Sequence, residues 1–239
     1  SVSAVPLKTQ AWSPDGEWLA YVSFESHSSA IWLQRVRTGE RRRLLARPGI
    51  NGSPAFEPTR GDRLAVTLST VGGNLDIYLV ALADGALTRV TSNPAIDTEA
   101  VFSPDGRSLY FTSDRAGSPQ IYRAEALANA PAKRMTFTGS YNARPRLSPD
   151  GKQLAMVTLA GGSYRVAVQD LATGVVRQLT KGPLDESPSF APNGAMLIYA
   201  GRDRGQGVLA TVAIDGLTTQ RLKADEGEVR EPVWGPRRP

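Results

Sequence analysis

The chain has 239 residues, of which 41% are hydrophobic and 21% charged, and this is the composition of an ordinary globular protein. No apolar run reaches the roughly 18 residues that a membrane-spanning helix needs, so we expect no direct membrane insertion. The absence of cysteine excludes disulfides, thiolate zinc sites and cysteine nucleophiles.

The net charge of +5 does not by itself indicate a nucleic-acid partner. The basic residues are spread along the chain, and one arginine recurs at the same place of an internal repeat. These arginines are Arg43, Arg89, Arg134, Arg177 and Arg221. A charge that recurs with a repeat indicates a structural position on a solvated strand. We therefore predict no nucleic-acid partner.

One type of turn recurs along the whole chain, first as Trp12-Ser13-Pro14-Asp15-Gly16. Its prolines lie at positions 14, 58, 104, 149, 192 and 236, which are 43 to 46 residues apart. A fixed period in this range is typical of repeat architectures. Proline, aspartate and glycine supply the backbone geometry of such a turn, so we interpret Asp15 and its equivalents as turn residues and not as catalytic acids.

Each repeat contains short runs of β-type residues bounded by glycine, proline, aspartate or serine. The predicted fold is all-β: a six-bladed β-propeller with five complete four-stranded blades plus the first strand of the closing blade. We expect a single propeller domain over residues 1–239. Its blades are expected at approximately 9–46, 53–92, 97–137, 142–181 and 185–223, and the closing-blade strand at 229–236.

Two columns of the repeat indicate how the blades pack. The residue two positions before each repeat proline is bulky: Trp12, Phe56, Phe102, Leu147, Phe190 and Trp234. The residue before that one is usually small: Ala11, Ala55, Val101, Ser189 and Val233, with Arg146 as the exception. Bulky residues are expected to fill the space between adjacent sheets, and small residues suit a crowded central axis.

The segments before the turns differ from one another, unlike the turns themselves. They are 51–54, 93–99, 141–145 and 184–194, joined near the end of the chain by 207–209 and 229–234. In this order they resemble the propeller of the TolB family, periplasmic proteins of the Tol-Pal system of Gram-negative bacteria, and the resemblance covers essentially the whole chain. In that family an α/β domain precedes the propeller. We expect that domain to be absent from this chain, and with it the contacts that the family makes there with other Tol proteins.

The same segments enter the first strand of each blade, so they lie around one mouth of the channel, where loops on a rigid scaffold usually carry binding function. Five residues before the repeat prolines stand Thr9, Ser53, Glu99, Arg144, Ser187 and Glu231. The predicted partner-binding residues are Asn51, Asp97, Thr98, Glu99, Asn142, Arg144, Asp185, Glu186, Arg230 and Glu231. The alternative interpretation is that such residues only cap strands and satisfy backbone donors.

The resemblance implies a non-enzymatic, protein-binding scaffold in the periplasm that supports outer-membrane integrity and cell division. It implies that Pal, the peptidoglycan-associated lipoprotein, docks on this mouth, and that colicin translocation segments compete for it during import. Carboxylates at a channel mouth attract a cationic peptide or a hard cation, and the resemblance implies that such channels can hold Ca²⁺. No loop has calcium-binding spacing, so we assign no metal site and no cofactor.

An enzyme is the competing class of function. Propellers of this repeat type also occur attached to serine peptidases, which carry a Gly-x-Ser-x-Gly elbow and a catalytic histidine. The chain has no such elbow, and its single histidine, His27, lies in a polar turn. Adjacent carboxylates such as Asp185 and Glu186 point to opposite sides of a strand and are poorly placed to act together. We predict no catalysis; a truncated peptidase-like propeller and an engineered propeller fragment remain as alternatives.

Overall fold

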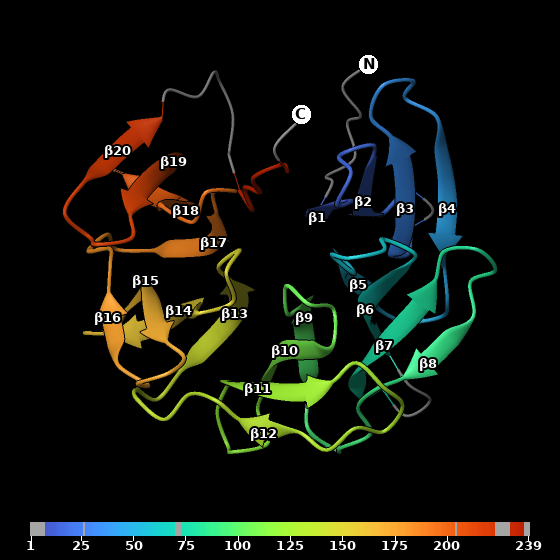
Figure 1. Ribbon diagram of the computed structural model, residues 1–239, viewed down its shortest axis with the longest axis horizontal. Helices are drawn as coiled ribbons and strands as arrows, with labels where there is room; N and C mark the ends of the chain where they lie inside the picture. The colour runs from blue at the N-terminus through green and yellow to red at the C-terminus, as the bar shows by residue number, and fades with distance from the viewer. Residues whose placement is uncertain (1–7, 26, 70–72, 204, 223–229, 237–239) are drawn as a thin grey trace.

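The computed structural model describes residues 8–25, 27–69, 73–203, 205–222 and 230–236, and these residues form five antiparallel sheets of four strands each. The sheets are arranged in a ring, which confirms the predicted all-β propeller (Figure 1). The described part of the chain contains no helix long and apolar enough to cross a membrane.

Each blade is a meander whose four strands follow the chain from the axis outward. Blade 1 contains β1 (Lys8–Trp12), β2 (Trp18–Ser23), β3 (Ala30–Arg35) and β4 (Arg41–Leu45). Blade 2 contains β5 (Asn51–Phe56), β6 (Arg63–Ser69), β7 (Leu75–Ala81) and β8 (Leu87–Arg89). Blade 3 contains β9 (Asp97–Phe102), β10 (Ser108–Ser113), β11 (Gln120–Glu125) and β12 (Lys133–Arg134).

Blade 4 contains β13 (Asn142–Leu147), β14 (Gln153–Ala160), β15 (Ser163–Asp170) and β16 (Val176–Gln178). Blade 5 contains β17 (Asp185–Phe190), β18 (Met196–Asp203), β19 (Gln206–Ala213) and β20 (Thr219–Leu222). The recurring arginines lie on the outermost strands, as expected of a solvated structural position.

The hydrophobic core is divided among the interfaces between neighbouring blades. The leucine that follows each turn is fully buried in blades 2 to 5, as Leu64, Leu109, Leu154 and Leu197. Each packs with residues of the preceding blade, and the bulky Phe56, Phe102, Leu147 and Phe190 join the same clusters, as predicted. Leu19 of blade 1 is only half-buried, because no blade precedes blade 1 among the described residues.

The repeated turn is held by its own side chains. In blade 3 the Ser103 hydroxyl donates to Asp105, and the same carboxylate accepts the backbone N–H of Arg107 at 3.1 Å. Gly106 has a φ of +70°, a backbone conformation that glycine adopts without steric cost. The turns also pack on one another around the ring, and a Cβ on Gly61 would lie 3.1 Å from Pro14. The aspartates are therefore turn residues, as interpreted from the sequence.

The segment 230–236 occupies the sixth place of the inner ring, between β17 and β1 (Figure 1). The backbone N–H of Trp234 donates to Ser189 Oγ of β17 at 3.1 Å, and Gly235 packs on the indole of Trp12. The predicted closing-blade strand was 229–236. Residue 229 lies outside the described residues, and 230–236 is not a strand, because no described strand offers it a hydrogen-bonding ladder.

Candidate functional site

Every inner strand is interrupted at the same place by a break in its register with the second strand. One residue at each break, five before the repeat proline, has a positive φ, and the closing segment has one at the same place. The angles are 43° at Thr9, 47° at Ser53, 58° at Glu99, 57° at Arg144, 55° at Ser187 and 51° at Glu231. We call these six residues the mouth column.

Such bulges re-aim a side chain, and they often lie next to functional sites. The left-handed conformation costs a non-glycine residue about 1–2 kcal/mol. Among the other non-glycine residues that the structure describes, only His27 and Asn129 share it. The strained position recurs in all five blades and in the closing segment, so it is part of the repeat and places six side chains at equivalent points around the axis.

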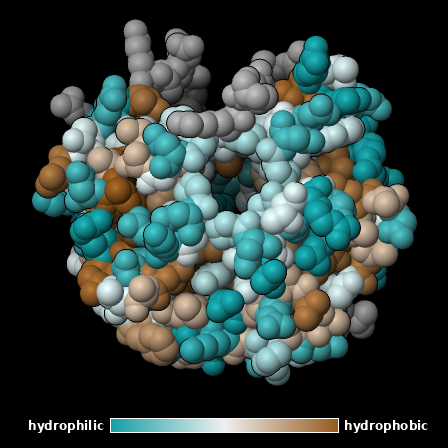
Figure 2. All heavy atoms as spheres, viewed as in Figure 1, coloured by the Kyte–Doolittle hydropathy of each residue, from teal (hydrophilic) through white to brown (hydrophobic). Residues whose placement is uncertain are grey.

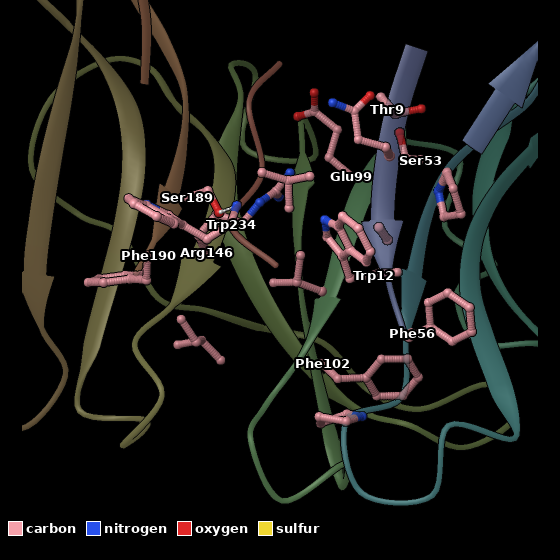
Figure 3. Close-up of a pocket in the computed structure, with 18 of the residues that line it drawn as sticks. Thr9, Trp12, Ser53, Phe56, Glu99, Phe102, Arg146, Ser189, Phe190 and Trp234 are labelled. Atoms are coloured by element: carbon pink, nitrogen blue, oxygen red, sulfur yellow. Dashed lines mark hydrogen bonds between the residues drawn. The ribbon is translucent and has the colours of Figure 1, made fainter. Parts of the chain in front are cut away.

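The mouth column lines one end of a central cavity of about 530 Å³. Figure 2 shows the ring hollowed at its centre, with hydrophilic residues around the hollow. Deeper in the cavity lie the residues three positions before the prolines, which we call the inner column: Ala11, Ala55, Val101, Arg146, Ser189 and Val233. Five of the six turn prolines line the other end, namely Pro14, Pro58, Pro104, Pro149 and Pro236. The bulky aromatic side chains form its walls (Figure 3).

Arg144 of blade 4 is the centre of an ionic network at the mouth. Its Nε lies 3.2 Å from Glu99 Oε1 of blade 3, and its Nη1 lies 3.7 Å from Glu186 Oε2 of blade 5 and also contacts Ser187 Oγ. Each of the three charged side chains has between 26% and 31% of its surface exposed to solvent, so a partner can reach them. The network presents charge of both signs at one point of the mouth.

Threonines of the neighbouring blades hold two of the bulges. Thr112 Oγ1 on β10 accepts the backbone N–H of Arg144 at 3.0 Å and donates to Glu99 Oε2 at 3.1 Å. Thr67 Oγ1 on β6 accepts the backbone N–H of Glu99 at 3.3 Å. These bonds satisfy the backbone groups that a bulge removes from the ladder, so the strained residues are fixed before any partner arrives.

Four of the predicted partner-binding residues are buried in the structure. Asn51, Asp97 and Asn142 have no exposed surface, and only 3% of the surface of Asp185 is exposed. Asp97 forms a two-point ion pair with Arg115, whose Nη2 lies 2.9 Å and 2.8 Å from the two carboxylate oxygens.

The other three residues brace the loop that precedes their own strand. Asn51 Nδ2 donates to the carbonyl oxygen of Arg47 at 2.7 Å, and Asn142 Nδ2 donates to that of Thr138 at 2.8 Å. Asp185 Oδ2 accepts the backbone N–H of Gly182 at 2.8 Å. These four side chains are buried, and each makes a hydrogen bond or ion pair inside the protein, so we leave them out of the proposed contact surface.

The remaining predicted residues lie at the mouth. Glu99, Arg144 and Glu231 belong to the mouth column and line the cavity, whereas Thr98 is half-buried beside it and does not line it. Glu186 and the exposed Arg230 line a second, small cavity of about 50 Å³ next to the channel. The prediction omitted Thr9, Ser53 and Ser187, although their common distance from the repeat proline marks them in the sequence.

A pair of tyrosines beside the network has no recurring signal in the sequence. Tyr141 and Tyr164 of blade 4 meet edge to face, with ring centroids 5.2 Å apart. Burial raises the pKa of the Tyr141 hydroxyl, and the nearby Glu99 carboxylate raises it further. Tyr164 is 39% exposed and adds an aromatic surface at the mouth.

The arrangement suits binding more than chemistry. Among the described residues, no three histidine, cysteine, aspartate or glutamate side chains come close enough together to hold a metal ion. What the site offers is an open cavity with a charged rim and apolar walls, which fits an inserted peptide segment or side chain.

Comparison with known proteins agrees with this geometry. Residues 1–238 match the family described as the TolB beta propeller domain. The chain is 49% identical over 238 residues to the Tol-Pal system protein TolB of Xanthomonas oryzae pv. oryzae, covering 99% of this chain and 54% of that protein. It is 46% identical over 235 residues to the protein of the same name from Bordetella pertussis, covering 98% and 53%.

The crystal structure of TolB from Acinetobacter baumannii superposes with a TM-score of 0.91 at 46% identity, covering 98% of this chain and 58% of that one. The chain thus spans about half the length of the curated relatives it matches. The family match over nearly all residues and the close superposition lead to one conclusion: this chain belongs to the TolB β-propeller family.

Proposed function

We propose that the chain is a non-catalytic scaffold of the Tol-Pal system in the periplasm, and that its channel mouth binds the lipoprotein Pal. The carrying observation is the mouth column, in which one strained backbone position, repeated around the ring, directs six side chains into one cavity. The relatives at 46–49% identity are named Tol-Pal system proteins, which supports the choice of system. This role would contribute to outer-membrane integrity and cell division.

The proposal includes a second occupant of the same mouth. A cavity of about 530 Å³ that opens at the mouth column has room for an extended peptide segment. Colicin translocation segments would compete with Pal for it, and bound Pal would therefore be displaced by them. A metal is not required by this proposal, because the Glu99 carboxylate is already paired with Arg144.

The test is calorimetric titration with the soluble domain of Pal. A variant carrying Glu99→Lys and Glu186→Lys places three positive charges together around Arg144, and we expect it to weaken Pal binding by roughly tenfold or more. The melting temperature should change little, because partly exposed ion pairs contribute about 1 kcal/mol or less each. Glu125→Lys, on an exposed position of β11, is the matched control. Unchanged affinity of the double variant would refute the site.

A further inference from the structure

We propose that the channel contains a carboxylate-binding site at Arg146, deeper than the contact that we propose for Pal. The inference goes beyond the proposed function, because it concerns the inner column and not the mouth column. The ligand class is a carboxylate attached to an apolar or aromatic body. Such a group is carried either by a free organic acid or by a polypeptide, and the test below separates the two sources.

Arg146 is an exception in its column of the ring. The five other members of the inner column are alanine, valine or serine, and all line the same cavity. One long cationic side chain therefore stands among five short ones. Figure 3 shows Arg146 and, from the neighbouring blade, the shorter Ser189. A structural role at this position does not require arginine, because the equivalent place in the other blades is filled without one.

Arg146 lacks an acidic partner among the described residues. Its Nη1 donates to the carbonyl oxygen of the adjacent Pro145 at 2.8 Å, and it forms no ion pair with an acidic residue that the structure describes. Glu99 is paired with Arg144, and Glu231 accepts the backbone N–H of Thr9 at 2.6 Å.

Burial lowers the pKa of the Arg146 guanidinium, whereas the carboxylates of Glu99 and Glu231 raise it by a smaller amount. Even so, an arginine stays protonated in proteins. A partly buried guanidinium without a counter-ion attracts an anion, because it retains several unused N–H donors that face the cavity.

The walls around Arg146 suit a carboxylate that carries an apolar or aromatic body. A guanidinium has a planar fork of N–H donors that matches the two oxygens of a carboxylate. Trp12, Phe56, Phe102, Phe190 and Trp234 line the same cavity. A ligand that places its carboxylate on Arg146 would therefore lay an apolar or aromatic body against these rings.

The test compares acids with their neutral amides on the protein. The free-acid arm uses phenylacetate and phenylacetamide, and the polypeptide arm uses acetyl-Gly-Gly-Phe with a free carboxylate and the same peptide as its amide. Tryptophan fluorescence reports on the site, because Trp12 and Trp234 line the cavity. We expect the acid to bind on the order of tenfold more tightly than its amide in at least one arm, since a charge-assisted hydrogen bond is lost in the amide.

Two variants assign the preference to Arg146. Arg146→Met should remove the difference between acid and amide, whereas Arg43→Met, on an exposed position of β4, should keep it. A measurement on the unmodified protein keeps the test valid if the variant misfolds. The side-chain Nε–H signal of Arg146 in a nitrogen-15 NMR spectrum should shift when the acid is added and stay in place when the amide is added.

The outcomes show whether the site exists and which kind of molecule supplies the carboxylate. A preference in the phenylacetate arm alone assigns a free organic acid, and a preference in the peptide arm alone assigns a polypeptide carboxylate. Equal binding of acid and amide in both arms, no binding of any probe at about 10 mM, or an acid preference that survives Arg146→Met overturns the proposal. A failure of Pal binding leaves this result untouched, because no arm of the test contains Pal.

Discussion

The guanidinium of Arg144 lies 3.2 Å from the carboxylate of Glu99, and this ion pair joins the inner strands of two neighbouring blades. Both residues have a left-handed backbone, at φ 57° and 58°. Two strained positions on different sheets therefore direct opposite charges toward each other at the mouth of the channel.

This pair predicts a modest energetic coupling. A double-mutant cycle with Arg144→Met and Glu99→Gln should give a coupling of about 0.5–1 kcal/mol in the free energy of unfolding, because both side chains are partly exposed to water. Urea denaturation of the four proteins measures it. A cycle between Glu99→Gln and Arg43→Met serves as the control and should give no coupling, and a value near zero for the Arg144 cycle would show that the pair is only a surface contact.

The buried Asp97 predicts a much larger loss of stability. Asp97→Ala leaves the Arg115 guanidinium without its two-point partner, and Arg115 is itself only 17% exposed. We expect the free energy of unfolding to fall by about 3 kcal/mol. The neighbouring Thr98→Ala is the control, with an expected loss below about 1 kcal/mol.

The Asp97→Ala variant also distinguishes a residue that stabilises the fold from one that contacts Pal. Asp97→Ala should bind Pal with unchanged affinity at a temperature where it is folded, because its side chain does not reach the surface. A tenfold weaker affinity of the folded variant would restore Asp97 to the binding residues.

The backbone conformation at Ser53, in the mouth column, predicts that glycine is tolerated there and that valine is not. Its φ of 47° suits glycine and opposes a β-branched side chain. We expect Ser53→Gly to leave the free energy of unfolding unchanged or raise it by up to about 1 kcal/mol, and Ser53→Val to lower it by about 1–2 kcal/mol. Thermal unfolding of the two variants is sufficient, and equal losses for glycine and valine would contradict the backbone argument.

The repeated turns predict an acid dependence of stability. The serine hydroxyl that donates to each aspartate lowers the pKa of Asp15, Asp105 and Asp150 below the usual value of 3.8. A group whose folded-state pKa is lowered stabilises the fold above its unfolded pKa, and that contribution disappears as the pH falls through the folded pKa. The free energy of unfolding should therefore decline as the pH drops below about 4.

Asparagine is the matched replacement for these aspartates. The turn of blade 5 already has Asn193, whose side-chain oxygen accepts the backbone N–H of Ala195 at 3.1 Å. A triple variant with asparagine at 15, 105 and 150 should therefore fold and show a flatter decline between pH 2 and about pH 4 than the parent. Parallel curves for the two proteins would mean that the acid sensitivity arises at other carboxylates.

The repeat in the sequence was sufficient to predict the ring, because each turn and each leucine column marks a blade directly. It also located the mouth, since the distance to the repeat proline picks out Glu99 and Arg144 among many charged residues. It did not separate Asp97 from Glu99. That distinction depends on Arg115, which comes from another loop of the blade, and on the bulge that turns Glu99 toward the axis.

The segment 230–236 shows a second limit of the sequence. Its pattern copies a first strand, and Glu231 has a positive φ like the other residues of the mouth column. Strand structure nevertheless needs a partner backbone, which depends on what lies beside the segment and not on its own residues.

In blades 3 and 4, the bulge separates the identity of the displayed residue from the stability of the frame. At Glu99 and Arg144, the backbone N–H groups are held by threonines of the neighbouring blades and not by the side chains on display. Substitutions at these positions can therefore change which partner is recognised while the ring keeps its shape. Under the proposed function, the specificity of the mouth can therefore be altered at blades 3 and 4, in evolution or by design, without rebuilding the ring.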